Sequence, residues 1–167
     1  MKCVLDASPL IFLAKLNRLD LIAPISGVTL HLSTLVQNEV LGSGVAEAES
    51  QAVKDFLIRC RVHPSAKARA YAAALSAADN ATLALAIHLK ADLLVADDCI
   101  LRAMAEAQGI RPLGTLGVLL GAQQRKILSA RETRRLLDAL IALHGFRISI
   151  NVYQAALARI QTISGKR

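Results

Sequence analysis

Short hydrophobic runs alternate with helical patterns along most of the chain. Runs of mainly apolar residues at 2–5, 28–32, 92–96 and 110–113 have the length of buried strands, and 62–64 could form a further short strand. Between these runs, apolar residues recur at helical spacing. This order predicts a central parallel sheet covered by helices on both faces, which is a three-layer α/β/α fold.

The helical stretches carry start and stop signals. Ser8 and Pro9 can open a first helix, and Ser76 with Asp79 has the pattern of a capping box. Gly109 follows the end of another predicted helix. Helices are predicted over 10–16, 34–41, 45–59, from the capping box to about 90, up to 107 and over 116–124, with an alanine-rich helical region before 76.

A two-helix tail follows, over 130–163, with a turn near Gly145. We find no repeat and no linker, so we expect a single domain over 1–167, with a core of about 1–125 and a helical extension of about 126–167. The tail has an apolar stripe at helical spacing, made of Leu136, Leu137, Leu140 and Ile141. Such a stripe is typical of core packing, with a partner surface as the alternative.

The composition, 54% hydrophobic and 20% charged, is that of a soluble globular domain. At 167 residues, folding buries enough surface to need neither disulfides nor a structural metal. We interpret Cys3, Cys60 and Cys99 as core residues in a reducing cytosol, because they form no paired motif and have apolar surroundings. No signal-peptide pattern is present, and no apolar stretch reaches the roughly 20 residues of a membrane span. We expect a cytoplasmic protein that does not span a membrane.

Positive charge is concentrated late in the chain. Residues 1–100 contain nine Lys+Arg and ten Asp+Glu, whereas residues 101–167 contain eleven and three. This imbalance favours a polyanionic partner such as RNA, with solvated helix faces as the alternative. Because the chain has only five aromatic residues, phosphate contacts should dominate over base stacking.

Two acidic residues stand at the ends of apolar strands. Asp6 follows the first predicted strand and Asp97 follows the fourth. Ligands of open parallel sheets collect beyond the carboxyl ends of the strands. Asp6 could also bind amides of its own turn, and Asp97 or Asp98 could cap the next helix. Two carboxylates at one edge repel each other unless a cation or a proton intervenes, so the pair favours a site.

Two further acids can reach the same edge. Glu39 lies in the middle of a helix, and Asp79 opens the helix that leads into the strand before Asp97. Each has a simpler role available, solvent exposure for Glu39 and capping for Asp79. Together the four carboxylates would form a hard oxygen site suited to Mg²⁺ or Mn²⁺. Such a site can hold a scissile phosphate and activate water.

Other chemistries lack their sequence patterns. The four histidines, His31, His63, His88 and His144, are far apart in the sequence and form no zinc motif, so we interpret them as surface or helix-end residues. The phosphate-binding glycine motifs and GxSxG are absent. A phosphatase of the haloacid dehalogenase type would have a second aspartate where this chain has Ser8.

Several segments together resemble a PIN domain. They are VLDASPLIFLAKLNRLDLI at 4–22, the helix with Glu39, ADNATLALAIHLKADLLVADD at 78–98 and GIRPLGTLGVLL at 109–120. The Gly-Thr-Leu-Gly-Val-Leu stretch and RISINVYQAALARI at 147–160 are similar to a subgroup close to VapC-type toxins. The resemblance covers nearly the whole chain, and it implies a PIN-like three-layer fold with a central parallel sheet and a C-terminal helical extension.

The resemblance also implies a site and an activity. It places the family's acids on Asp6, Glu39, Asp79 and Asp97, where they would hold Mg²⁺ or Mn²⁺, with Ser8 in support. It implies a metal-dependent ribonuclease, often a toxin held inactive by a small antitoxin protein. We also expect a homodimer.

Some assignments have alternatives. Asp98 would replace Asp97 as the fourth ligand if the alignment shifts by one residue. Arg102 is a candidate phosphate contact or a plain surface arginine. A non-catalytic PIN-like module that binds nucleic acid or a partner is the first rival function, and a small-molecule phosphohydrolase is the second.

Overall fold

The chain forms two compact units, residues 1–114 and 115–167. The computed structural model describes residues 1–22, 27–42, 47–65 and 71–165. The first unit contains the sheet, and the second consists of helices. No helix in the described part of the chain is both long and apolar enough to cross a membrane.

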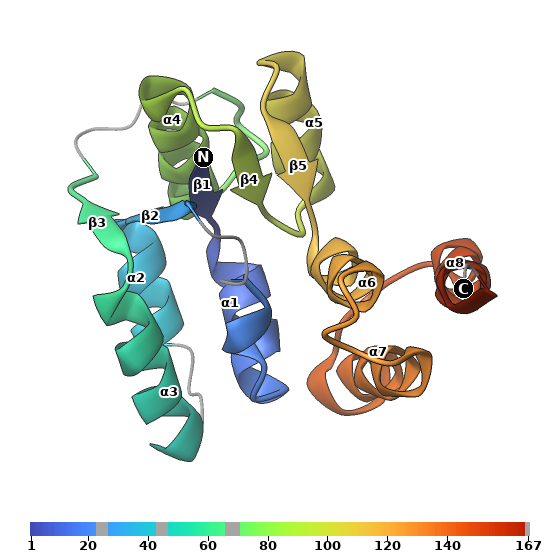
Figure 1. Cartoon of the computed structure of the whole chain (residues 1–167). Helices are drawn as coiled ribbons and strands as arrows, with labels where there is room; N and C mark the ends of the chain where they lie inside the picture. The colour runs from blue at the N-terminus through green and yellow to red at the C-terminus, as the bar shows by residue number, and fades with distance from the viewer. Residues whose placement is uncertain (23–26, 43–46, 66–70, 166–167) are drawn as a thin grey trace. The chain divides into compact units, whose positions relative to one another are not determined.

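The sheet of the first unit has five parallel strands in the order β3-β2-β1-β4-β5 (Figure 1). The strands are β1 (Lys2–Leu5), β2 (Thr29–Ser33), β3 (Arg61–His63), β4 (Leu93–Val95) and β5 (Arg111–Leu113). The chain runs from β1 outward through β2 to β3, then returns to β4 on the other side of β1 and continues to β5. The strand order therefore reverses between β1 and β4, which is where open α/β sheets bind their ligands.

Helices cover both faces of this sheet and confirm the three-layer α/β/α fold. They are α1 (Ala7–Lys15), α2 (Thr34–Gly42), α3 (Glu47–Ile58), α4 (Ala77–Leu89) and α5 (Cys99–Ala107), with a 3-10 helix at Leu19–Ile22. Helices α1, α2 and α3 pack against one another, and α4 packs against α5. Because both faces are covered, the central strands are almost wholly apolar.

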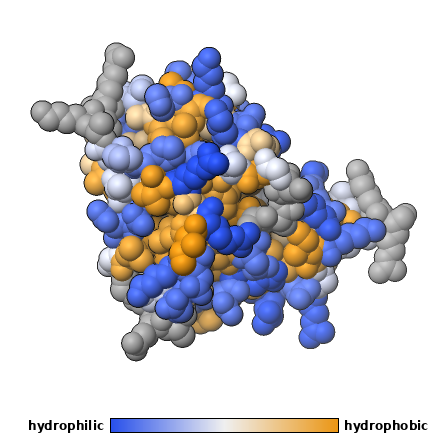
Figure 2. All heavy atoms as spheres, turned by 60° about the vertical axis from the view of Figure 1, so that its left-hand side comes forward, coloured by the Kyte–Doolittle hydropathy of each residue, from blue (hydrophilic) through white to orange (hydrophobic). Residues whose placement is uncertain are grey.

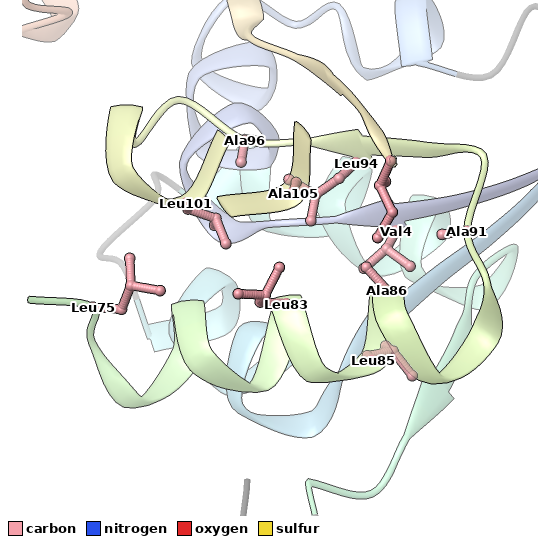
Figure 3. Close-up of a cluster of buried hydrophobic side chains, with 11 residues drawn as sticks. Val4, Leu75, Leu83, Leu85, Ala86, Ala91, Leu94, Ala96, Leu101 and Ala105 are labelled. Atoms are coloured by element: carbon pink, nitrogen blue, oxygen red, sulfur yellow. The ribbon is translucent and has the colours of Figure 1, made fainter. Parts of the chain in front are cut away.

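The hydrophobic core on the α4 side joins the two central strands to both helices (Figure 3). Val4 of β1 and Leu94 of β4 are fully buried there. Leu83 and Ala86 of α4 and Leu101 of α5 close the cluster. This packing fixes the ends of β1 and β4, from which the acidic residues emerge.

The outer surface of the first unit is mixed. Figure 2, in which the side with β3, α2 and α3 comes forward, shows apolar side chains in patches between hydrophilic ones. Leu35 and Leu41 of α2 and Ile58 of α3 are exposed. Isolated exposed apolar residues of this kind are ordinary in soluble proteins.

The second unit consists of α6 (Thr115–Gln124), α7 (Ala130–His144) and α8 (Ile150–Gly165), each of which contacts the other two. Ser129 and Glu132 form a capping box at the start of α7. Leu136, Leu137 and Leu140 are buried, while Ile141 is 36% exposed. Core packing therefore accounts for three of the four residues in the predicted stripe.

Two predictions about local structure are wrong. Residues 71–75, part of the alanine-rich stretch, form turns and not a helix; the preceding residues 66–70 lie outside the described ranges. Cys99 is exposed because it begins α5, whereas Cys3 is buried and Cys60 partly so.

The prediction for His31 also fails, because this residue is 3% exposed in β2. Its Nδ1 lies 2.9 Å from Nε2 of His63 on the neighbouring strand, and its Nε2 lies 2.9 Å from Oγ1 of Thr29. Burial lowers the pKa of His31, and the neighbouring His63 lowers it further. Cross-strand pairing thus satisfies a polar side chain that the sequence pattern assigns to the surface.

Candidate functional site

Asp6 is the centre of the acidic site. It directly follows β1, and its backbone N–H donates to the carbonyl of Val95 at the end of β4, with an N···O distance of 2.9 Å. The residue is only 3% exposed. Thr82, which is fully buried on α4, donates a long hydrogen bond of 3.4 Å to Oδ1 of Asp6. The sheet and α4 therefore fix this carboxylate beside the switch point, the place between β1 and β4 where the strand order reverses.

The surroundings of Asp6 oppose its ionisation. Burial raises the pKa of Asp6 from its ordinary 3.8 to about 7, and the negative charges of Asp79 and Glu39 add to the effect. The backbone N–H groups of Ala7 and Ser8 act in the opposite direction, although Asp6 makes no side-chain capping hydrogen bond to α1. A charged Asp6 therefore lacks sufficient compensation within the described part of the chain.

Asp79 reaches the site from the first turn of α4. Its Oδ2 accepts a 3.0 Å hydrogen bond from the backbone of Ser76, and the hydroxyl of Ser76 accepts one of 3.1 Å from the backbone of Asp79. The predicted capping box is thus confirmed. The same carboxylate raises the pKa of Asp6, so capping and membership of the acidic cluster are compatible.

Asn80 holds the segment that precedes this cap. Its side-chain oxygen accepts hydrogen bonds from the backbones of Tyr71 and Ala72, at 2.7 and 3.4 Å. Its side-chain nitrogen donates to three carbonyls, those of Ala72, Leu75 and Ser76. Because Asn80 is only 7% exposed, these bonds replace contacts with water. Asn80 therefore orders the approach to α4 and supports the position of Asp79.

Replacing Asn80 by alanine should lower the free energy of unfolding by about 2 kcal/mol, because buried backbone groups lose their partners. Chemical denaturation measured by circular dichroism would detect this loss. Asn151→Ala is the matched control, since Asn151 lies exposed on α8. Equal stability of the two variants would contradict the positioning role of Asn80.

Glu39 comes from α2, which begins immediately after β2. Ser33, the last residue of β2, accepts a 3.2 Å hydrogen bond from the backbone of Val36 and so stabilises the start of the helix. Glu39 is exposed, yet partial desolvation and the charge of Asp79 raise its pKa. Helices α2 and α4 are in contact, which brings these two acids toward Asp6.

The fourth acid has different neighbours. Asp97 is half-buried and lies two residues beyond β4, whereas Asp98 is exposed and caps α5 through a 2.8 Å hydrogen bond from the backbone of Leu101. A Cβ at Gly114 would lie 3.0 Å from Oδ1 of Asp97 and 2.8 Å from Nη1 of Arg102. The Asp97 carboxylate therefore has a guanidinium as its neighbour, and the capping role predicted for this pair falls on Asp98.

The structure brings three of the predicted acids into electrostatic contact: Asp6, Asp79 and Glu39. Asp97 emerges from the adjacent strand end. Ser8 is half-buried at the start of α1 and contributes its backbone N–H to the surroundings of Asp6. In the described ranges, no three carboxylate, imidazole or thiol groups are close enough together to hold a metal ion.

The chemistry of these donors nevertheless fits a hard divalent cation. All of them are carboxylates, which Mg²⁺ and Mn²⁺ prefer, and no histidine or cysteine stands among the three that interact. Burial, followed by repulsion from Asp79 and Glu39, raises the pKa of Asp6, and a bound cation would relieve that repulsion. The fit rests on donor type and charge.

Sequence reasoning missed three residues of this site: Thr82, Asn80 and Gly114. Thr82 and Asn80 are polar residues in a buried part of α4, and their position three and one residues after Asp79 was the available signal. Gly114 follows a strand directly, as Asp6 does, but its role depends on the side chains of Asp97 and Arg102.

These features define a doubly wound α/β protein with acidic residues at its switch point. The model of the DUF3368 family, described as a PIN domain, matches residues 2–162. A search of the curated proteins finds no match. A solved structure of a PilT N-terminus domain protein from the hyperthermophilic archaeon Sulfolobus solfataricus is similar in fold, with a TM-score of 0.55 and 18% identity over 73% of this chain and 93% of that one.

The chain belongs to the PIN domain family. PIN domains are generally nucleases and typically use divalent metals. The predicted fold and family are thereby confirmed.

Proposed function

We propose that this protein is a metal-dependent ribonuclease that hydrolyses phosphodiester bonds of RNA. The observation that carries the proposal is the buried carboxylate of Asp6, whose pKa is raised by burial and by two other acids beside it. Holding like charges close together lowers the stability of the folded protein, and such an arrangement is typical of a functional site. Membership of the PIN domain family supports a nuclease in preference to other metal-dependent hydrolases.

Asp6, Glu39, Asp79 and Asp97 would hold one or two Mg²⁺ or Mn²⁺ ions. When bound, such an ion lowers the pKa of a water molecule and stabilises charge on a phosphate. Around it, the contact from Thr82 and the backbone N–H groups after Asp6 hold the central carboxylate in place. No histidine general base is required by this arrangement.

The charge of the chain supports a polyanionic substrate. Residues 115–167 contain nine Lys+Arg and two Asp+Glu, whereas the formal charge of the whole chain is +7. The helical unit thus accounts for the entire surplus. Positive charge of this kind attracts RNA through its phosphates and makes binding depend on salt.

The test is cleavage of labelled single-stranded and looped RNAs by the purified chain, with Mg²⁺, with Mn²⁺ and with EDTA. We expect cleavage that requires a divalent ion and is lost in EDTA. DNA oligonucleotides of the same sequences determine whether the 2′-hydroxyl is needed. Cleavage that persists in EDTA would contradict a metal-dependent reaction.

A non-catalytic PIN-like module is the second candidate. It is favoured by the spacing of the acids, since no three of them form a ready cation site in the described ranges. Mn²⁺ binding measured by electron paramagnetic resonance discriminates the two. A nuclease requires Mn²⁺ binding that depends on Asp6, whereas a non-catalytic module would bind RNA without binding Mn²⁺.

The remaining expectations of the sequence analysis stay predictions. They are a small antitoxin partner, a homodimer and the cytoplasm as the compartment. A small-molecule phosphohydrolase would turn over p-nitrophenyl phosphate without cutting RNA. Light scattering of the purified chain gives the oligomeric state.

A further inference from the structure

We propose that Arg102 binds a phosphate of the RNA beside the acidic site, and that Gly114 leaves open the space in which its guanidinium lies. This inference rests on the proposed function, because it takes RNA as the substrate. It assigns Arg102 a role in substrate binding, and it assigns Gly114 a positioning role.

The ends of β4 and β5 place both residues at one edge of the sheet. The backbone N–H of Ala96 donates to the carbonyl of Leu113, with an N···O distance of 3.0 Å. Asp97 and Gly114 each follow one of these paired residues. The two strand ends therefore present an acid and a glycine side by side.

The start of α5 brings the arginine to the same place. Asp98 caps the helix, and the backbone N–H of Arg102 donates to the carbonyl of Asp98 at 3.1 Å. Arg102 thus lies in the first turn of α5, close to the end of β4. Its side chain is half-buried, so its guanidinium loses less conformational freedom on binding than a fully exposed arginine would.

Gly114 explains how the guanidinium fits there. A Cβ at this position would meet Nη1 of Arg102 at 2.8 Å and Oδ1 of Asp97 at 3.0 Å, both closer than ordinary van der Waals contact. Only side-chain ends would have to move, because the nearest backbone atom, the carbonyl oxygen of Ala96, is 3.6 Å away. An added methyl group would therefore disturb these two charged groups with little effect on the fold.

The chemistry of this position favours a phosphate. A phosphodiester that approaches Asp6 and Asp79 meets like charges, and Arg102 supplies a positive charge at the neighbouring strand end. A guanidinium presents paired N–H donors that match two phosphate oxygens. The carboxylate of Asp97 lies beside the same guanidinium.

The first experiment compares Arg102→Ala with Arg111→Ala. Arg111 is an exposed arginine at the opposite end of β5, so its loss changes the net charge equally. Binding of a fluorescent single-stranded RNA is measured by anisotropy in EDTA over a series of salt concentrations. We expect Arg102→Ala to weaken binding about tenfold and to reduce the salt slope by about 0.7, the value of one phosphate contact on a single strand. Arg111→Ala should change affinity less than about twofold.

The second experiment tests Gly114 in a double-mutant cycle. Gly114→Ala should weaken RNA binding in the wild-type background but cause no further loss in the Arg102→Ala background, because the guanidinium that it displaces is already gone. Gly42→Ala is the control, since a Cβ at Gly42 meets nothing within 4 Å. Additive losses would overturn the positioning role.

A third measurement separates substrate binding from an ion pair with Asp97. The proposal requires Arg102→Ala to retain Mn²⁺ affinity while RNA affinity falls. Unchanged RNA affinity, with or without a change in Mn²⁺ affinity, would overturn it. If the wild-type chain binds RNA through Arg102 but cuts none with any metal, the proposed nuclease fails and only RNA binding by Arg102 is retained. Cleavage with binding independent of Arg102 removes the inference alone.

Discussion

Asp6→Asn is expected to reduce RNA cleavage at least about a thousandfold, as removal of a central catalytic group commonly does. The substitution keeps the shape of the side chain and removes the negative charge that would hold the cation. Asp6 is also the carboxylate on which the other two acids act. Single-turnover cleavage with saturating Mg²⁺ and Mn²⁺ measures the loss, and Mn²⁺ titration shows whether metal binding is lost with it.

Asp55→Asn is the matched control for this measurement. Asp55 is exposed on α3, and its change removes the same charge. We expect the control to retain nearly full activity. Cleavage by Asp6→Asn at the rate of the control would exclude the acidic cluster as the catalytic site.

The second large effect concerns stability in the absence of metal. At neutral pH, the free energy of unfolding of the Asp6→Asn variant should exceed that of the wild-type protein. The pKa of Asp6 rises from 3.8 to about 7 in the folded protein, so the folded state binds the proton more tightly than the unfolded state. Stability therefore falls as pH rises from about 4 to about 7 and then levels. The Asp6→Asn variant lacks this loss. The difference in free energy of unfolding between the variant and wild type should therefore reach on the order of 4 kcal/mol above pH 7.

Urea denaturation in EDTA between pH 4 and pH 8 measures this difference. Asp55→Asn should show no such pH-dependent gain over wild type. Adding Mg²⁺ at pH 8 should stabilise the wild-type chain and leave Asp6→Asn unchanged, because only the wild type has the central carboxylate. A constant difference between wild type and Asp6→Asn across this pH range would show that Asp6 is not desolvated.

The sequence was sufficient to predict the fold class and the acids at the strand ends. Apolar runs of strand length define the strands, and Asp6 and Asp97 directly follow two of them. The strand order could not be predicted from the sequence, because pairing of β1 with both β2 and β4 depends on contacts between distant segments. Asp6 lies where a ligand is expected to bind because the strand order reverses between β1 and β4.

Polar residues that are buried through tertiary contacts were predicted least well. The alanines before α4 have helical propensity, but Asn80 binds the backbones of Tyr71 and Ala72 and holds that segment in turns. His31 is buried because His63, 32 residues later in the chain, pairs with it across two strands. In both cases a side-chain hydrogen bond, medium-range for Asn80 and long-range for His31, overrides the local preference.

The different environments of the three thiols make selective chemical labelling feasible. Burial raises the pKa of Cys3 and of Cys60 to about 12, so both remain unreactive protonated thiols near neutral pH. Cys99 is exposed at the first residue of α5. A maleimide fluorophore will therefore attach at Cys99 in the unmutated chain. Its emission would report the arrival of RNA from the same helix turn that bears Arg102.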